Sequence, residues 1–245
     1  MINHRIMADA VDFYTGKGYQ YIDVPWLVDV ESVRMAAPPG VRQFETFAGF
    51  LPASGEQSFY HLLKAGHILP GNWQTITPCF RDEKSVNDVV CTHFLKLELF
   101  SVGHNRRQPR DICDAARSFM SSYNLHTRID DMSDGSMDIM SSDSVELGSY
   151  GSRNHDGFSW SYGTGVAEPR FPTVVKKNTK KLSEIPNETY VYHNWDYYVV
   201  MRTPLTKNGK PPTNGNVYLS TCFLSNGYTS LEVSSETTVE VLKQH

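Results

Sequence analysis

The sequence predicts an α+β fold in which an antiparallel β-sheet is flanked by helices and followed by a β-rich C-terminal appendage. Apolar residues recur at helical spacing in several segments, and two aromatic, β-branched runs are joined by a polar loop, as in an antiparallel strand pair. Beyond Leu182 similar runs alternate with Asn-Gly pairs, which are strong hairpin-turn signals. We therefore expect two domains, residues 1–182 and 183–245.

The composition of the whole chain narrows its class. A chain of 245 residues can form one large domain or a core with a small appendage, and 40% hydrophobic residues indicate a folded rather than a disordered protein. No stretch approaches the roughly 18 uninterrupted apolar residues of a membrane-spanning helix, so we expect no membrane contact and a cytoplasmic location. The net charge of −4 gives no general attraction to nucleic acid, and the four dispersed cysteines lack zinc-ligand spacing.

The N-terminal third predicts a helix, a strand and a long loop. A helical stripe opens the chain and ends near Gly16 and Gly18. Residues 19–30 are aromatic and branched, and Pro25 among them favours an edge or interface strand because it cannot donate a ladder hydrogen bond. Residues 33–55 are broken repeatedly by Pro and Gly and are predicted to be loop.

The central part predicts alternating helices and strands. Helices are expected at residues 56–68 and 109–123, and strands at 73–80, 91–102, 125–129, 137–140 and 145–150. The strands 73–80 and 91–102 should form an antiparallel pair with a long polar loop.

Residues suited to binding a nucleotide lie on this strand pair and its loop. Arg81 offers a guanidinium for phosphate, Phe94 an aromatic face for a base, and Glu83 and Glu98 carboxylates for amino groups. Further along, Gly163 and Gly165 place small residues on a strand that something must approach closely, and Arg170 follows at a turn or helix start. Together, in this order, the two clusters predict a nucleotide site.

These clusters resemble the signature motifs of the class II aminoacyl-tRNA synthetase catalytic domain. Motif 1, a helix leading through Gly to a strand with a Pro, is similar to residues 18–25; motif 2, Phe-Arg-x-Glu, is similar to residues 80–83; and motif 3, Gly-x-Gly with a downstream Arg, is similar to residues 163–170. The resemblance covers roughly residues 1–180. Pro172, directly after motif 3, is expected to interrupt the helix that normally continues from it.

The strand 93–99 is similar to the seryl-type pattern His-Gln-Phe-x-Lys-Val-Glu, which indicates the class IIa, seryl-like branch. Residues 54–56 occupy the place of its Thr-x-Glu loop, and residues 138–140 and 146–149 resemble its Asp-Ile-Glu and Glu-x-x-Ser stretches. The hairpin-like tail gives no recognisable anticodon-binding domain, so the chain resembles a stand-alone paralogue.

The resemblance implies a role for each matching residue. Arg81 would bind the ATP α-phosphate, Glu83 the adenine amino edge, and Phe94 the adenine face, while Arg170 would hold the γ-phosphate and the other adenine face. The remaining matches are Gly163 and Gly165 at the ATP site, Glu56 and Glu98 for the substrate α-ammonium group, and Glu146 and Ser149 for Mg²⁺. Arg81 and Arg170 would also be the catalytic pair.

The implied function is ATP-dependent activation of an amino acid to an aminoacyl-adenylate, followed by transfer to an acceptor. The acceptor could be tRNA, a small RNA or a carrier protein, and a minimal true synthetase remains open beside a stand-alone activating enzyme. The alternative is a catalytically inactive paralogue that acts as a binding or regulatory protein. Motif 1 resembles a dimer-interface element, so a homodimer built on Tyr21, Val24, Pro25 and Trp26 is expected.

Overall fold

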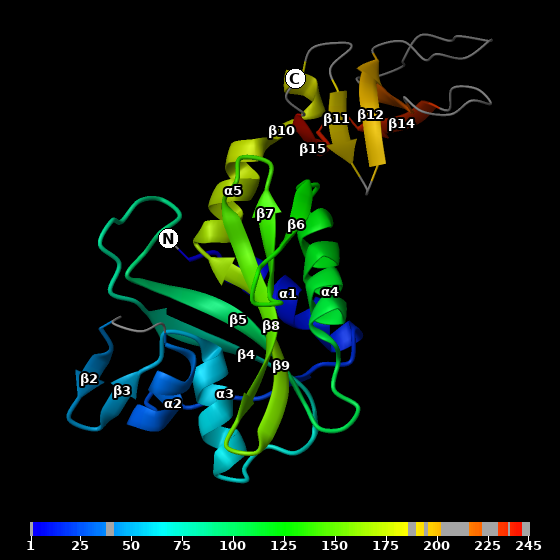
Figure 1. Ribbon diagram of the computed structural model, residues 1–245. Helices are drawn as coiled ribbons and strands as arrows, with labels where there is room; N and C mark the ends of the chain where they lie inside the picture. Colours follow the sequence, from blue (N-terminus) through cyan, green and yellow to red (C-terminus); the bar gives the residue numbers. More distant parts are fainter. Residues whose placement is uncertain are drawn as a thin grey trace. The chain divides into compact units, whose positions relative to one another are not determined.

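The computed structural model describes residues 2–37, 42–185, 190–193, 196–201, 216–221, 230–234 and 236–241. The chain forms two compact units (Figure 1). The first comprises Met1–Phe119 and Arg128–Val174, and the second comprises Met120–Thr127 and Val175–His245. The second unit therefore takes in a short internal segment that no sequence pattern indicated.

A seven-stranded sheet forms the centre of the first unit, in the order β1-β4-β5-β9-β8-β7-β6. Its strands are β1 (Gln20–Tyr21), β4 (Gly71–Phe80), β5 (His93–Val102), β6 (Thr127–Asp131), β7 (Met137–Ser141), β8 (Glu146–His155) and β9 (Phe158–Glu168). β1 pairs with β4 in parallel, whereas the pairs from β4 through β5, β9 and β8 to β7 are antiparallel. The predicted antiparallel sheet flanked by helices is confirmed.

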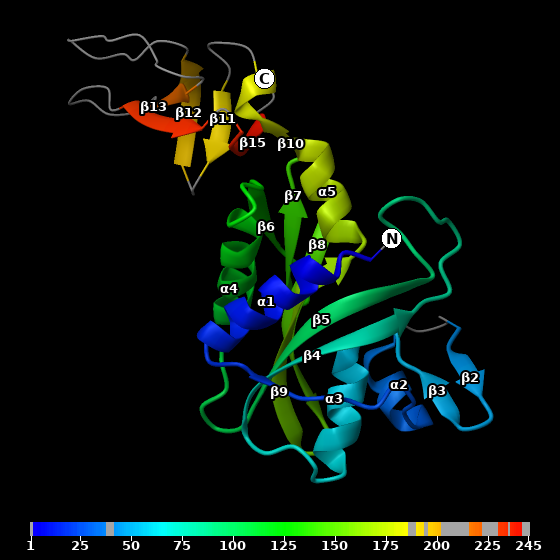
Figure 2. The same cartoon turned by 180° about the vertical axis from the view of Figure 1, so that it is seen from behind.

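Helices cover both faces of this sheet. They are α1 (His4–Gly16), α2 (Val30–Ala36), α3 (Gly55–Lys64), α4 (Pro109–Ser121) and α5 (Arg170–Asn178). Neighbouring residues of β5 separate the faces, because Leu97 lies beside Tyr14 of α1 whereas Glu98 lies beside Gly55 of α3. Figure 2 shows α1 and α4 together on the face away from α3.

Two sets of aromatic side chains hold the helices to the sheet. On the α3 face the Phe59 and Phe100 rings stack with centroids 4.8 Å apart, and Trp160 extends the stack. On the α1 face Phe13 and Phe119 pack at 5.5 Å and join α1 to α4. Burial of such rings is the main source of stability in a core of this kind.

The prediction for residues 19–55 is only partly correct. Only residues 20–21 of the predicted strand pair with the sheet, although they do form its edge. Within the predicted loop the chain forms α2 and a small hairpin of β2 (Phe44–Thr46) and β3 (Gly49–Leu51). The short helix begins because the Asp29 carboxylate caps it by accepting from the Ser32 amide at 2.9 Å, a signal that the Pro and Gly breakers obscured.

The expectation that Pro172 interrupts the helix after motif 3 is wrong. α5 begins at Arg170, so Pro172 falls in the first turn, where a missing amide proton removes no intrahelical hydrogen bond. Phe171 and Val174 are the buried residues of α5.

The second unit contains a six-stranded sheet in the order β10-β15-β11-β12-β13-β14. These strands are β10 (Thr179–Lys181), β11 (Tyr190–His193), β12 (Asp196–Met201), β13 (Asn216–Thr221), β14 (Ser230–Ser234) and β15 (Thr238–Val241), and a 3₁₀ turn η1 (Leu182–Glu184) follows β10. Its core is aliphatic: Ile185, Val191, Val200, Leu219 and Val239. The three predicted Asn-Gly turns, at 208–209, 214–215 and 226–227, lie outside the described residues.

Of the cysteines within the described residues, Cys79 and Cys113 are buried free thiols and Cys91 is a partly buried one. No helix among the described residues combines the length and the apolar character needed to cross a membrane.

Candidate active site

One cavity of about 440 Å³ lies in the first unit and gathers residues from five separate parts of its sequence. It is lined by residues of the segments around α2 and β2, around α3, along β4 and β5, along β8, and from β9 into α5. Eight of the ten site residues predicted from the sequence line it: Glu56, Arg81, Glu83, Phe94, Glu98, Glu146, Ser149 and Arg170. Gly163 and Gly165 do not.

The register of β5 and β9 explains how these strands face the cavity. Phe94, Lys96 and Glu98 alternate along β5 and all line the cavity. On β9 the cavity-lining residues are Tyr162, Thr164 and Ala167, of which Thr164 and Ala167 pair with Glu98 and Lys96. The three-residue spacing of Thr164 and Ala167 is possible because the pairing shifts between Leu97 and Glu98, a β-bulge that leaves one extra residue in β9.

A second β-bulge leaves one extra residue in β8. Met140 pairs with Glu146 but Ile139 pairs with Gly148, so Leu147 is the extra residue. Glu146 and Ser149 consequently both line the cavity, although three positions apart. Two oxygen-bearing side chains thus lie on one face of one strand.

Arg81 follows β4 and lies over Phe94. Its Nε donates to the Ala53 carbonyl at 3.2 Å, and its guanidinium carbon is 5.1 Å from the centroid of the Phe94 ring. Within the part of the chain that the structure describes, it has no carboxylate partner at ion-pair distance. Arg81 therefore keeps donors for an anion.

Arg170, the first residue of α5, connects three segments. Its Nε donates to the Val89 carbonyl at 3.0 Å, and its Nη1 donates to the Glu146 carbonyl at 3.2 Å. Nη1 also lies 3.7 Å from the Glu146 carboxylate. Arg170 is thus held more firmly than Arg81, and its nearest carboxylate is one of the two residues predicted to bind the metal.

Glu98 belongs to a buried polar cluster at the centre of the cavity. Lys96 Nζ lies 2.6 Å from Glu98 Oε2, with 8% and 2% of the two side chains exposed. The Ser54 hydroxyl donates to the same oxygen at 3.1 Å and accepts from Lys96 at 3.2 Å. Ser54 also caps α3, and Gly55 is needed there because an added Cβ would lie 2.9 Å from Glu98 Cβ.

Glu56 forms a second buried cluster. Its Oε1 accepts from Arg153 Nε at 2.9 Å and from Trp160 Nε1 at 2.8 Å. Burial raises the pKa of the Glu56 carboxyl, although the charge of Arg153 and the hydrogen bond from Trp160 act in the opposite direction. Both carboxylates predicted to receive a substrate ammonium group therefore already have a cation beside them.

The two glycines of the predicted ATP site accommodate protein atoms. A Cβ on Gly163 would lie 2.4 Å from the Tyr150 ring and 2.7 Å from Ile112, and a Cβ on Gly165 would lie 2.4 Å from Leu97. The Tyr14 hydroxyl donates to the Gly165 carbonyl at 2.9 Å. The close approach inferred from the sequence is thus made by side chains on the α1 face of the sheet.

Several cavity residues were given no role from the sequence, among them Lys96, Arg153, Tyr162 and the capping Ser54. Strand alternation with Phe94 and Glu98 was a signal for Lys96. Arg153 had no such signal, because its contact with Glu56 joins residues 97 positions apart.

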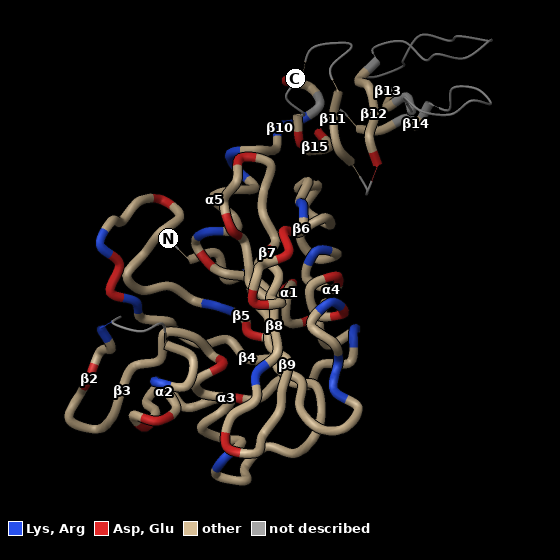
Figure 3. The backbone as a smooth tube through the Cα atoms, in the orientation of Figure 1, with Lys and Arg blue, Asp and Glu red and all other residues tan. Residues whose placement is uncertain are grey.

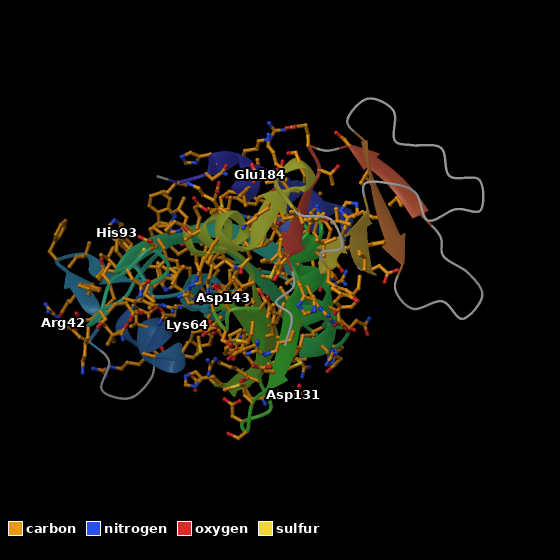
Figure 4. The ribbon with its side chains drawn as sticks, turned by 90° about the horizontal axis from the view of Figure 1, so that it is seen from above. Arg42, Lys64, His93, Asp131, Asp143 and Glu184 are labelled. Carbon is orange, nitrogen blue, oxygen red and sulfur yellow. The ribbon has the colours of Figure 1, made fainter. Side chains whose placement is uncertain are left out.

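Charges of both signs line the cavity in equal number. The cations are Arg42, Arg81, Lys96, Arg153 and Arg170, and the anions are Glu56, Asp82, Glu83, Glu98 and Glu146. Figure 3 shows basic and acidic residues mixed along β5 and β8, and Figure 4 labels Arg42 just before β2. Such a site can hold a substrate that itself carries both signs.

Comparison with known proteins was positive only at the level of structure. No protein-family model matches the sequence, and no curated protein matches it. The structure resembles a pyrrolysyl tRNA synthetase from Desulfitobacterium hafniense with a TM-score of 0.55 and 14% identity, over 71% of this chain and 68% of that one. The fold is class II aminoacyl-tRNA synthetase-like.

Two seryl enzymes show the same synthetase-like fold. The seryl-tRNA synthetase of Pyrococcus horikoshii, complexed with ATP, gives a TM-score of 0.55 at 15% identity over 68% of this chain. The cytoplasmic serine-tRNA ligase of Naegleria fowleri, in complex with AMP, gives 0.56 at 16% identity over 74% of this chain. The chain spans 48% of the length of each of these two enzymes.

Proposed function

We propose that this synthetase-like protein uses ATP to activate the carboxylate of an amino acid, forming an aminoacyl-adenylate, and passes the aminoacyl group to an RNA or a carrier protein. The observation that carries the proposal is that Arg81, Phe94 and Arg170 line the same cavity as the buried carboxylates Glu56 and Glu98. These residues come from distant parts of the sequence, and the fold of the known neighbours supports the same chemistry.

The nucleotide end of the cavity is the part around Phe94 and Arg170. In the proposed arrangement adenine stacks on Phe94 with its amino edge toward Glu83, Arg81 binds the α-phosphate, and Arg170 binds the γ-phosphate. A carboxylate and a triphosphate repel, so the two guanidinium groups must offset that charge and align the carboxylate oxygen behind the α-phosphorus. Pyrophosphate then leaves on the opposite side, and no side-chain nucleophile is needed.

Glu146 and Ser149 suit Mg²⁺. Both present oxygen atoms on the cavity face of β8, and Mg²⁺ prefers a few protein oxygens together with phosphate oxygens. When bound, the ion would supply positive charge between the phosphates. Glu146 would then exchange its loose 3.7 Å contact with Arg170 for the metal, which leaves Arg170 for phosphate.

The proposal of a branch within the synthetase class rests on the sequence pattern of β5. Residues 93–99 support the seryl-like branch, whereas the TM-score of 0.55 is the same for the pyrrolysyl and the Pyrococcus horikoshii seryl structures. We therefore propose the seryl-like branch from the sequence alone, with residues 1–182 as the catalytic part and 183–245 as an accessory part. A cytoplasmic location belongs to the same proposal.

One observation favours the alternative of an inactive, binding or regulatory paralogue. The charged side chains Lys96 and Glu98, and Arg153 and Glu56, already neutralise one another. A cavity that is satisfied without a ligand could persist as a scaffold. The spare donors of Arg81 favour the active reading, since a scaffold has no need of an uncompensated guanidinium at a cavity wall.

Amino-acid-dependent exchange of labelled pyrophosphate into ATP tests the proposal. All standard amino acids are assayed with Mg²⁺ present, together with the Arg81→Ala variant and the surface variant Arg110→Gln as a matched control. Exchange with at least one amino acid that falls by roughly 10²–10³-fold in Arg81→Ala and persists in Arg110→Gln supports activation. ATP binding without exchange for any amino acid would favour the inactive paralogue. Charging of bulk tRNA then separates a minimal synthetase from an enzyme with another acceptor.

A further inference from the structure

Arg153 has hydrogen-bond donors that its own chain does not use. Its Nε donates to Glu56, whereas Nη1 and Nη2 make no hydrogen bond with any described residue. The side chain lines the cavity and is 36% exposed. Two terminal nitrogens of a guanidinium that face an open cavity form a fork that matches a carboxylate or a phosphate.

The position of this fork is fixed from several sides. The guanidinium carbon lies 5.0 Å from the centroid of the Tyr162 ring, and Glu56 is itself held by Trp160. Gly151 makes room for Tyr162, because a Cβ there would lie 2.6 Å from the Tyr162 hydroxyl. A guanidinium that is stacked on a ring and anchored through Nε loses little freedom when it binds an anion.

Arg153 lies at the opposite end of the cavity from the phosphate-binding residues. Glu146, which contacts Arg170, begins β8, and Arg153 follows seven positions later. Because Leu147 is the extra residue of the bulge, six strand steps of roughly 3.3 Å separate them, so the two Cα atoms are about 20 Å apart along the strand. Arg153 therefore does not share the phosphates proposed for Arg81 and Arg170.

Lys96, the other cation whose charge acts on Glu56, does not have a comparable capacity to bind an anion. Lys96 is almost fully buried, and its ammonium already contacts Glu98 and Ser54. The charge of Asp134 also acts on Arg153, but Asp134 makes no ion pair with it at 4.0 Å or less. No carboxylate among the described residues completes the Arg153 fork, which leaves its terminal nitrogens for an anion from outside the chain.

We propose that Arg153 is a specificity-determining residue that binds an anionic group on the side chain of the substrate, so that the amino acid activated here is acidic. The inference rests on the proposed function and narrows its substrate class. The bound group would be an anion with two oxygens in the plane of the Arg153 guanidinium. A carboxylate or a phosphate ester can supply such a pair of oxygens. Glu56 then acts as the anchor of Arg153, and Glu98 remains the carboxylate proposed for the α-ammonium group.

Direct binding to the wild-type chain with ATP and Mg²⁺ present tests the inference without any mutation. Calorimetry compares three matched pairs: aspartate with asparagine, glutamate with glutamine, and O-phosphoserine with serine. Charge-assisted hydrogen bonds predict that one anionic member binds roughly 10–100-fold more tightly than its neutral counterpart. The pair that responds distinguishes a carboxylate from a phosphate.

Three variants test whether the preference for the anionic ligand depends on Arg153. In Arg153→Gln the preference for the anionic member should fall to within a few-fold of unity while the affinity for ATP alone stays unchanged. The double variant Glu56→Gln/Arg153→Gln, which leaves no unpaired buried carboxylate, should behave in the same way if the single variant folds poorly. Arg110→Gln, a surface substitution on α4, should keep the wild-type preference.

Two results overturn the inference, and they are distinguishable from failure of the proposed function. If ATP binds but every neutral member binds as well as its anionic partner, Arg153 does not select an anion although the nucleotide site stands. A preference for the anionic ligand that persists in both Arg153 variants would likewise show that Arg153 does not select an anion. If ATP itself does not bind, the proposed function fails and the inference fails with it.

Discussion

Arg81 and Arg170 face the same cavity but are held by different partners. Arg81 is anchored by one backbone carbonyl and the Phe94 ring, whereas Arg170 contacts two carbonyls and the Glu146 carboxylate. The loosely held arginine is the one proposed for the α-phosphate, where geometry and charge change during reaction. The firmly held arginine is proposed for the γ-phosphate, which moves little before pyrophosphate leaves.

Alanine at these two positions should therefore give defects of different kinds. Arg81→Ala removes a transition-state contact, so turnover should fall by roughly 10²–10³-fold. Arg170→Ala should mainly raise the apparent KM for ATP, because ground-state and transition-state binding are lost together. Steady-state pyrophosphate exchange measures both, with folding checked by circular dichroism. Near-wild-type kinetics in both variants would refute the assignment of this cavity.

The raised pKa of Glu56 has a consequence for stability. Because the pKa in the folded protein exceeds the ordinary value of 4.5, the folded state binds more protons than the unfolded state between those two values. The contribution of Glu56 is therefore most favourable below pH 4.5 and is lost as the pH rises through the raised pKa. Urea unfolding of the wild type and Glu56→Gln at several pH values should show the advantage of Glu over Gln shrinking with rising pH. An advantage that grows with pH would contradict this.

At the scale of elements, the approach of α3 to β5 depends on a glycine. Gly55 is the first residue of α3, and a Cβ there would lie 2.9 Å from Glu98 Cβ and 2.9 Å from Thr77 Cγ2. Gly16, the last residue of α1, offers a matched helix-end glycine with nothing within 4 Å of an added Cβ. The same substitution can thus be tested in a crowded and in an open place.

Gly55→Ala should lower the free energy of unfolding by about 1–3 kcal/mol, the usual range for overpacking. It should also weaken substrate binding, because Ser54 and Glu56 on either side of it line the cavity. Gly16→Ala should be neutral or slightly stabilising, since alanine favours a helix. Chemical denaturation and ATP titration measure the two effects. Equal stability of the two variants would show that α3 can shift away from β5 without loss.

At the scale of the whole molecule, we predict a symmetric homodimer built on the segment around β1. Tyr21 and Trp26 are 45% and 61% exposed, and Leu27 and Val30 beside them are also exposed. Val24, which the sequence analysis placed at the interface, instead packs in the core of its own chain. Light scattering at micromolar concentration should give twice the chain mass, and Trp26→Ala should shift it toward the monomer. A monomeric wild type would exclude the dimer.

Truncation after Leu182 tests whether the proposed catalytic part is independent. Every residue that lines the cavity precedes this position, so ATP binding should survive. The cut removes the partners of residues 120–127, however, because Asn124 donates to the Thr238 carbonyl at 2.8 Å and His126 Nε2 lies 2.8 Å from the Tyr197 hydroxyl. We therefore expect a lower Tm with ATP affinity retained, as measured by thermal shift and calorimetry. A soluble fragment that no longer binds ATP would show that the second unit supports the cavity.

Local sequence patterns predicted most helices and strands of the first unit, but they did not predict the contacts between these elements. Alternation along β5 and helical spacing in α1, α3 and α4 are properties of neighbouring residues, so they could be seen in the sequence. The cap of α2 by Asp29 was masked by the Pro and Gly residues that follow it. The pairing of Arg153 with Glu56 depends on α3 meeting the β8–β9 hairpin, and a single sequence holds no local signal for such a meeting.

The two bulges determine which side chains of β8 and β9 face the cavity. Deletion of Gly165 would leave Thr164 opposite Glu98 and Ala167 opposite Lys96 in strict alternation, so both side chains would keep their face. Deletion of Leu147 would likewise keep Glu146 and Ser149 on one face of β8. A single deletion at any other position of either strand would move every side chain on one side of it to the opposite face, which is far more damaging than a substitution. A variant of this protein with β8 or β9 shortened by one residue could therefore keep its cavity wall by losing the bulge residue itself.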